Sequence, residues 1–359
     1  MDNTTVLWAV GVAFALAVLL GPPCIPLLRR LKFGQQVRDD GPATHLSKQG
    51  TPTMGGILIL LAATALALYT MTTPMARMPS VAAMIQKSGW EREPVAEKRA
   101  VAFVRFSDRG LSFWAMVVAC FGFGLVGFLD DYIKIAFKRS LGLTALQKLA
   151  GQLFFAVLFC LLLYLDGHPT HLAVPGTDWS LELGWGYWVL AVLVLLATSN
   201  AVNFTDGLDG LLAGTSALAY GAFLVIAMER MHQPASVFAA AMIGAVLGFL
   251  VFNAHPAKVF MGDTGSLAIG GGLGAVAVMT GNELLLPIIG GVFVVEMLSV
   301  IIQVVSFKTR GKRVFKMSPI HHHFELSGWS EWRVVTTFWF AGLVLAAAGL
   351  IWYKGIWTA

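Results

Sequence analysis

Ten long apolar runs, separated by polar segments, constrain the fold of this chain more than any other feature of its sequence. An α-helix of about 20 apolar residues crosses the ~30 Å hydrocarbon core of a bilayer. Helices also satisfy their own backbone hydrogen bonds, which lipid cannot do for them. The runs therefore predict an all-α integral membrane protein, a polytopic bundle of about ten transmembrane helices. They lie at 6–28, 54–71, 112–129, 149–166, 183–199, 210–228, 236–253, 266–281, 283–305 and 334–353.

The composition supports this class and excludes an ordinary soluble domain. Hydrophobic residues make up 57% of the chain and charged residues 13%, and the mean hydropathy is +0.73. We expect residues 1–359 to form a single membrane domain. The first run is expected to stay as a helix, because Asp2 and no basic residue precedes it. Cys24, Cys120 and Cys160 lie inside apolar runs, which favours packing roles over disulfides.

The distribution of lysine and arginine predicts the orientation of the bundle. With the N-terminus outside, the inside segments hold 16 of the 25 Lys and Arg residues. Of the 9 outside, 7 lie in one segment, 72–111, which also carries acidic residues. Because cytoplasmic loops carry the excess of basic residues, we expect both termini outside. The net charge of +5 suits contact with anionic lipids and phosphorylated substrates.

Five aspartates lie at the ends of apolar runs. When the runs alternate across a membrane, Asp130, Asp131, Asp206, Asp209 and Asp263 all reach the cytoplasmic face. Carboxylates next to hydrocarbon are costly and usually serve a function. Their convergence predicts a metal-dependent active site on the cytoplasmic face.

The Asp130-Asp131 pair ends the third run. Adjacent helical residues diverge by about 100°, so we expect the two carboxylates to point in different directions. One would face a metal or a phosphate, and the other would serve as a base or in binding. A solvated helix end is the alternative, although acids at a helix C-terminus oppose the macrodipole.

The segment 203–210 repeats polar side chains every three residues. Asn203, Asp206 and Asp209 would lie near one another if the segment were helical, whereas Gly207 and Gly210 permit a tight loop close to a ligand. An EF-hand is excluded because its ligand pattern and terminal Glu are missing. The alternative is an Asx-rich turn between helices.

Asp263 stands at the start of the eighth run. There it could cap a helix, or lie where a metal-bound pyrophosphate meets free backbone N–H groups. Phe260, three residues earlier, could stack on a base or sit as an aromatic at the membrane interface.

The last cytoplasmic loop is basic and contains three consecutive histidines, at 321–323. Neighbouring residues do not share a helical face, so phosphate or sugar contacts suit them better than zinc. The pattern Gly272-x-Gly274-x-x-Ala277 imitates a dinucleotide fingerprint, but no strand precedes it, and it predicts close helix packing instead. Glu296 is expected either to be buried in the bundle or to line a groove.

Five motifs together resemble one family, the polyprenyl-phosphate N-acetylhexosamine-1-phosphate transferases. The motifs are Lys48–Gly56, the Asp130-Asp131 pair, Asn203–Gly210, Phe260–Ser266 and Pro319–Glu325. The resemblance covers essentially the whole chain, and the triple histidine resembles the muramoyl branch of the family. The outer segment before the third run is longer than the family pattern leads us to expect.

This resemblance implies transfer of phospho-MurNAc-pentapeptide from UDP-MurNAc-pentapeptide to undecaprenyl phosphate, with release of UMP and a requirement for Mg²⁺. It implies a multi-pass protein of the bacterial plasma membrane. The expected partners are the two substrates and the lipid bilayer, and a second copy of the chain is a candidate partner. No nucleic acid is expected.

The resemblance also implies roles for individual residues. Asp263 would bind Mg²⁺, and Asp130 would act as the base on the lipid phosphate with Asp131 beside it. The substrate-binding residues would be Lys48, Thr53, Lys134, Asn203, Asp206, Asp209, Asn253, Phe260, His321, His322 and His323.

Two other functions stay open at the level of sequence. One is a related transferase that uses UDP-N-acetylglucosamine, against which the histidine block argues. The other is an ion-coupled transporter. Transporters place their polar sites near the bilayer midplane in repeated halves, whereas here the acids lie at the interface and the halves do not repeat.

Overall fold

The computed structural model describes residues 3–31, 50–63, 111–137 and 141–355. Within these ranges the regular elements are helices apart from one short hairpin, which confirms the all-α prediction. Eight of its helices are long and apolar enough to cross a membrane. They are α1 (Asn3–Arg30), α5 (Leu111–Ala136), α6 (Ala145–Asp166), α7 (Gly186–Thr205), α8 (Leu211–Glu229), α9 (Gln233–Asn253), α12 (Gly291–Arg310) and α14 (Glu331–Tyr353).

Two of the ten predicted spans are not among these eight helices, so the total of ten stays a prediction. Only the first part of run 54–71 is described, and it is helical from 56 to 63. Run 266–281 is α10 (Gly262–Met279), which is long enough but less apolar than the eight. Most of the charged segment 72–111 lies outside the described residues.

Helix α10 is the centre of the bundle and packs against α5, α7, α8 and α9. Every residue from Thr264 to Met279 is buried. A Cβ on Gly270 would lie 2.5 Å from Cα of Ser199 in α7, and one on Gly271 would lie 2.9 Å from the Phe123 ring in α5. The glycine-rich pattern in this run therefore serves close helix packing, as predicted.

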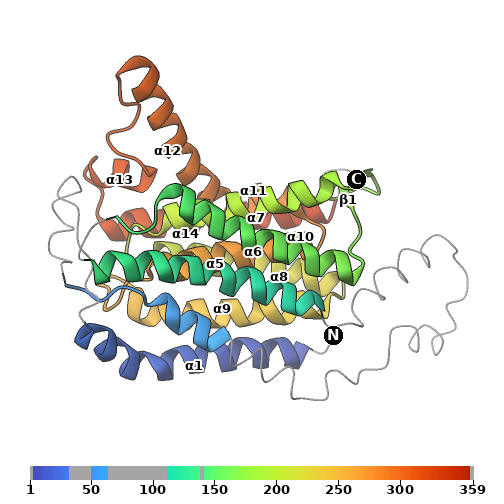
Figure 1. The fold of residues 1–359 in the computed structure, drawn as a ribbon, viewed down its shortest axis with the longest axis horizontal. Coiled ribbons are helices and arrows are strands. Elements are labelled where there is room, and N and C mark those ends of the chain that lie inside the picture. Colours follow the sequence, from blue (N-terminus) through green and yellow to red (C-terminus); the bar gives the residue numbers. More distant parts are fainter. Residues whose placement is uncertain (1–2, 32–49, 64–110, 138–140, 356–359) are drawn as a thin grey trace, which may run out of the picture.

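The ninth run is broken where its proline and glycines stand. A 3₁₀ turn η3 (Glu283–Leu285) leads into α11 (Leu286–Ile289), and α12 begins after Gly290. Pro287 lies in the first turn of α11, where a missing N–H costs no helix hydrogen bond, and the interruption before α12 is at Gly290. In Figure 1, α12 rises away from the bundle with the short α13 (Ile320–Glu325) beside it.

The two ends of the bundle differ. Strands β1 (His171–Ala173) and β2 (Ser180–Glu182) form an antiparallel hairpin. Figure 1 shows this hairpin, the start of α1 and the end of α14 at one end of the bundle, with α13 at the other. Local signals set the boundaries of α6: Thr144 and Gln147 form a capping box at its start, and Gly167 ends it in a left-handed conformation.

Candidate active site

Three carboxylates meet where α5 ends and α10 begins. Asp130 and Asp131 come from the last turns of α5 and Asp263 from the first turn of α10. Ligand atoms of all three lie within 4.8 Å of one another. The expectation that the first two point in different directions is therefore wrong. An oxygen of each carboxylate reaches the same cluster beside Asp263.

Hydrogen bonds hold both carboxylates in place. Asp131 accepts from the backbone N–H groups of Asp263 (3.2 Å) and Thr264 (2.9 Å) and from the Thr264 hydroxyl (2.8 Å). Asp130 accepts from the backbone N–H of Leu143 at 2.8 Å. The N-terminus of α10 thus supplies donors and a favourable dipole to the acids of α5.

Glycines allow the two helices to come this close. A Cβ on Gly127 would overlap the backbone carbonyl of Asp263. Gly262 has φ +74°, and a Cβ there would lie 2.7 Å from Asp131 Oδ2 and 2.9 Å from the hydroxyl of Thr53. Thr53, a predicted binding residue, therefore lies beside the three carboxylates.

Two lysines bind the same carboxylate from different helices. Nζ of Lys134 lies 2.8 Å from Asp263 Oδ2 and 2.5 Å from Asp130 Oδ2. Nζ of Lys148, in α6, lies 3.1 Å from Asp263 Oδ2. The amide of Asn203 donates to Asp263 Oδ1 at 2.8 Å. Lys148 is not among the residues predicted from the sequence, because no motif surrounds it.

The helix-cap interpretation of Asp263 is wrong. Met261 occupies the N-cap position of α10, and the first-turn N–H groups of Asp263 and Thr264 donate to Asp131. Instead, the Asp263 carboxylate faces the lysines and the other two acids. Three carboxylates are hard oxygen donors of the kind that bind divalent cations such as Mg²⁺, so the donor set fits a metal ion.

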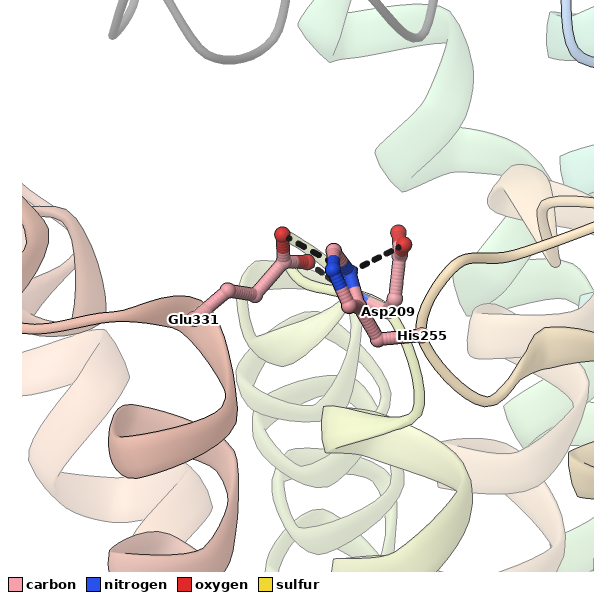
Figure 2. Close-up of side chains that lie close together, drawn as sticks. All are labelled: Asp209, His255 and Glu331. Carbon is pink, nitrogen blue, oxygen red and sulfur yellow. Dashed lines mark hydrogen bonds and ion pairs between the residues drawn. The ribbon is translucent and has the colours of Figure 1, made fainter.

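The segment 203–210 runs from the end of α7 into a loop, so its three polar residues do not share one helical face. Asn203 is helical, Asp206 ends α7, and Gly210 has φ +79°. Asp209 turns away from Asp263 into a second cluster with His255 and Glu331 (Figure 2). The glycine-loop alternative is therefore the one that the structure adopts.

Asp206 carries a strongly shifted pKa in this loop. Burial, followed by the negative charges of Asp263 and Asp131, raises the pKa of its carboxyl from 3.8 to about 8. A raised pKa means that the folded protein keeps this proton to higher pH than the unfolded chain does.

This shift predicts how stability depends on pH. Between about pH 4 and 8 the unfolded chain has lost the proton that the folded protein retains, so stability falls as pH rises. Asp206→Asn removes the titrating carboxyl and its contribution to the pH dependence of stability. In buffer that contains a chelator, the melting temperature of this variant should therefore fall less between pH 5 and 8 than that of the wild type. Asp178→Asn, at the exposed hairpin end, serves as the control. Equal slopes for Asp206→Asn and wild type would refute the shift.

The loop after α9 is tied to its neighbours through backbone groups. The side-chain amide of buried Asn253 accepts from Gly210 N–H and donates to the carbonyl of Val259, both at 3.0 Å. Phe260 is half-buried, and its backbone pairs with the Pro52 carbonyl and the Gly55 N–H at 2.8 Å. These contacts place the Phe260 motif next to the segment that holds Thr53. Lys48 lies outside the described residues.

The three histidines of α13 point to different partners. Nδ1 of His321 lies 3.1 Å from Glu296 in α12, and both side chains are fully buried. A Cβ on Gly207 would overlap the His321 ring, so this glycine admits the imidazole. His322 pairs with Glu325 at 2.8 Å, and His323 accepts from the Lys316 backbone at 3.1 Å. Among the described residues the histidines form no common metal site.

Comparison with known proteins places the chain among transferases. A family model described as glycosyl transferase family 4 matches residues 113–281. A signature described as phospho-N-acetylmuramoyl-pentapeptide-transferase signature 1 matches residues 48–60.

Relatives match along the whole chain. A phospho-N-acetylmuramoyl-pentapeptide-transferase of Bacillus pumilus is 52% identical over 357 residues, covering 99% of this chain and 100% of the relative. One of Bacillus thuringiensis is 53% identical over 347 residues, covering 97% of each. With this identity over its full length, the chain belongs to the phospho-N-acetylmuramoyl-pentapeptide-transferase family.

Proposed function

We propose that this protein transfers phospho-MurNAc-pentapeptide from UDP-MurNAc-pentapeptide to undecaprenyl phosphate, giving lipid I and UMP in the first membrane step of peptidoglycan synthesis. The observation that carries the proposal is the cluster of three carboxylates and two lysines at one end of an apolar bundle. Such a cluster suits two anionic substrates, one arriving from the cytoplasm and one held in the bilayer.

The three carboxylates are proposed to hold Mg²⁺, with Asp263 as the principal ligand. Such an ion would offset charge that develops on the diphosphate during phosphoryl transfer. Lys134 and Lys148 lie on the same carboxylate and are proposed to bind phosphate oxygens. Lys148 is an addition to the residues expected from sequence.

Asp130 is proposed to accept or orient the proton of the lipid phosphate. Its bond to the Leu143 N–H fixes one oxygen, and Lys134 pairs with the other. Asp131, held by Thr264, is proposed to brace the start of α10. The uridine, diphosphate and sugar are proposed to contact Lys48, Thr53, Asn203, Asp206, Asp209, Asn253, Phe260, His321, His322 and His323, with Phe260 stacking on the base.

Release of UMP tests the function directly. Purified protein with UDP-MurNAc-pentapeptide, undecaprenyl phosphate and Mg²⁺ should release UMP and form lipid I, and UDP-N-acetylglucosamine should not replace the donor. Turnover with the second donor alone would favour the related transferase. Absence of both reactions in folded protein would refute a transferase and favour the transporter alternative.

The bundle is proposed to lie in the bacterial plasma membrane as one domain, with both termini outside. A cysteine replacing Lys312 should resist a membrane-impermeant thiol reagent in intact cells, and one replacing Asp178 should react. Both positions are exposed, and they lie at opposite ends of the predicted topology. The half-buried Cys24 is changed to Ser in both variants. If the cysteine at position 312 reacts and the one at position 178 does not, the bundle has the opposite orientation.

A further inference from the structure

The start of α6 brings two hydrogen-bond donors to the carboxylates of the candidate active site. The N–H of Leu143, just before this helix, donates to Asp130 at 2.8 Å. Nζ of Lys148, in the first turn, lies 3.1 Å from Asp263 Oδ2 and 3.4 Å from Oδ1 of Asn203 in α7. The position of α6 against its neighbours therefore decides whether both donors reach the acids.

An amide pair lies one turn further into the bundle, on the same contact between α6 and α7. Nδ2 of Asn200 donates to Oε1 of Gln152 at 3.0 Å and to a carbonyl of its own helix at 2.8 Å. Gln152 follows Lys148 by four residues in α6, so the two side chains share a helical face. Asn200 and Asn203, three residues apart, share a face of α7 for the same reason. The amide pair thus continues the line of polar contacts that starts at the carboxylates.

Glutamine at position 152 carries a cost in stability. Its side chain is fully buried, and its Nε2 has no hydrogen-bond partner among the residues that the structure describes. A buried amide donor without a partner destabilises the folded protein, whereas a hydrocarbon side chain of the same length would avoid that loss. Stability alone therefore does not account for the amide of Gln152.

The neighbouring residue packs α6 against α5. A Cβ on Gly151 would lie 2.8 Å from Cγ2 of Val126 in α5, so the two helices are in close contact there. Apolar contacts have no preferred direction, and they permit small shifts and rotations of a helix. A hydrogen bond between two amides depends on both distance and angle. The bond between Gln152 and Asn200 therefore adds a directional contact that fixes α6 against α7 near Lys148.

We propose that Gln152 is a positioning residue, whose bond to Asn200 fixes α6 so that Lys148 reaches the phosphate oxygens. The inference rests on the proposed function, because that function assigns Lys148 to the diphosphate. Gln152 is fully buried and acts through Lys148. A shift of about 1 Å in a group that orients a substrate can lower a rate 10²-fold. Loss of the amide is therefore expected to affect substrate binding and turnover more than folding.

Gln152→Met in the full-length protein tests the inference, because methionine has an unbranched side chain of similar length and no amide. We expect kcat/KM for UDP-MurNAc-pentapeptide to fall about tenfold. The dissociation constant of UDP, which has no sugar to transfer, should rise by a similar factor. The melting temperature should stay close to that of the wild type, because the substitution also removes the unpartnered amide donor.

Ser216→Ala is the matched control. The Ser216 hydroxyl in α8 is also fully buried, and it has no hydrogen-bond partner in the described part of the chain. Its removal takes away a buried polar group of the same kind outside the contact between α6 and α7. This variant should keep the wild-type kcat/KM and the wild-type affinity for UDP.

A double-mutant cycle shows whether Gln152 acts through Lys148. When Gln152→Met is added to Lys148→Met, kcat/KM and the dissociation constant of UDP should change less than about twofold, because the positioned group is already absent. UDP binding supplies the cycle where turnover of Lys148→Met is too slow to measure. Gln152→Leu replaces Gln152→Met if the latter does not fold.

Two outcomes overturn the proposal. One is a folded Gln152→Met protein with wild-type kcat/KM and wild-type affinity for UDP. The other is an equal loss from Gln152→Met in the presence and absence of the Lys148 side chain, which shows that Gln152 does not act through Lys148. Failure of the proposed function is a separate result, because the wild-type protein would then release no UMP.

Discussion

Replacing Asp263 with asparagine is expected to lower the rate of UMP release by about 10³-fold or more. This carboxylate is the common partner of Lys134, Lys148 and Asn203 and a member of the three-carboxylate group. Removing its charge leaves two lysines without their shared anion and weakens any metal site there. Loss of such a group at a phosphoryl-transfer centre costs on the order of 4 kcal/mol, which corresponds to about 10³ in rate. Lipid I formation at saturating Mg²⁺ measures the effect.

The control for this variant is Asp178→Asn, which removes an exposed carboxylate from the hairpin end of the bundle. It should keep wild-type activity. The melting temperature of Asp263→Asn should stay high enough for the protein to be folded throughout the assay. Activity of Asp263→Asn within about threefold of wild type would show that this residue is not central to the chemistry.

Replacing Gly127 with alanine is expected to lower activity more than 100-fold and to reduce the melting temperature. The added methyl group would overlap the carbonyl of Asp263, which is backbone and cannot swing aside. Overpacking of this kind costs about 1–3 kcal/mol. Relieving the overlap must also move the start of α10 away from Asp131, whose hydrogen bonds hold the three acids together. Lipid I formation and a thermal melt measure the two effects.

Gly221→Ala in α8 is the matched control, because a Cβ there meets nothing within 4 Å. It should keep activity and stability, since alanine has the higher helix propensity. Equal activity in Gly127→Ala and Gly221→Ala would contradict the account of the contact between α5 and α10.

The helices and the face of the site follow from the sequence because both depend on local patterns. Apolar runs near the length of a bilayer predict the spans, although some observed helices extend beyond them, as α5 does to Ala136 and α7 to Thr205. The carboxylates converge for the same reason, since alternation places the ends of every second run on one face. The break before α12 coincides with Gly290 and Gly291, which follow Pro287 in the sequence.

The partners of individual side chains could not be predicted in this way. Lys148 reaches Asp263 only because α6 packs beside α5 and α7, and its sequence neighbours give no sign of that contact. Asp209 was grouped with Asp206 by spacing, but it joins His255 and Glu331 from distant segments. The direction of Asp131 depends on where α10 begins, and spacing along one helix says nothing about another helix.

The two lysines that pair with Asp263 affect how a cation and a diphosphate would bind at this site. Three carboxylates and two ammonium groups leave about one unit of negative charge, so the protein itself supplies most of the counter-ions. A cation that enters alone must compete with the ammonium groups, whereas a diphosphate draws those groups onto its own oxygens. By linkage, each ligand then favours the binding of the other by the same factor. If the site works as proposed, this charge balance would favour uptake of a cation and a diphosphate together.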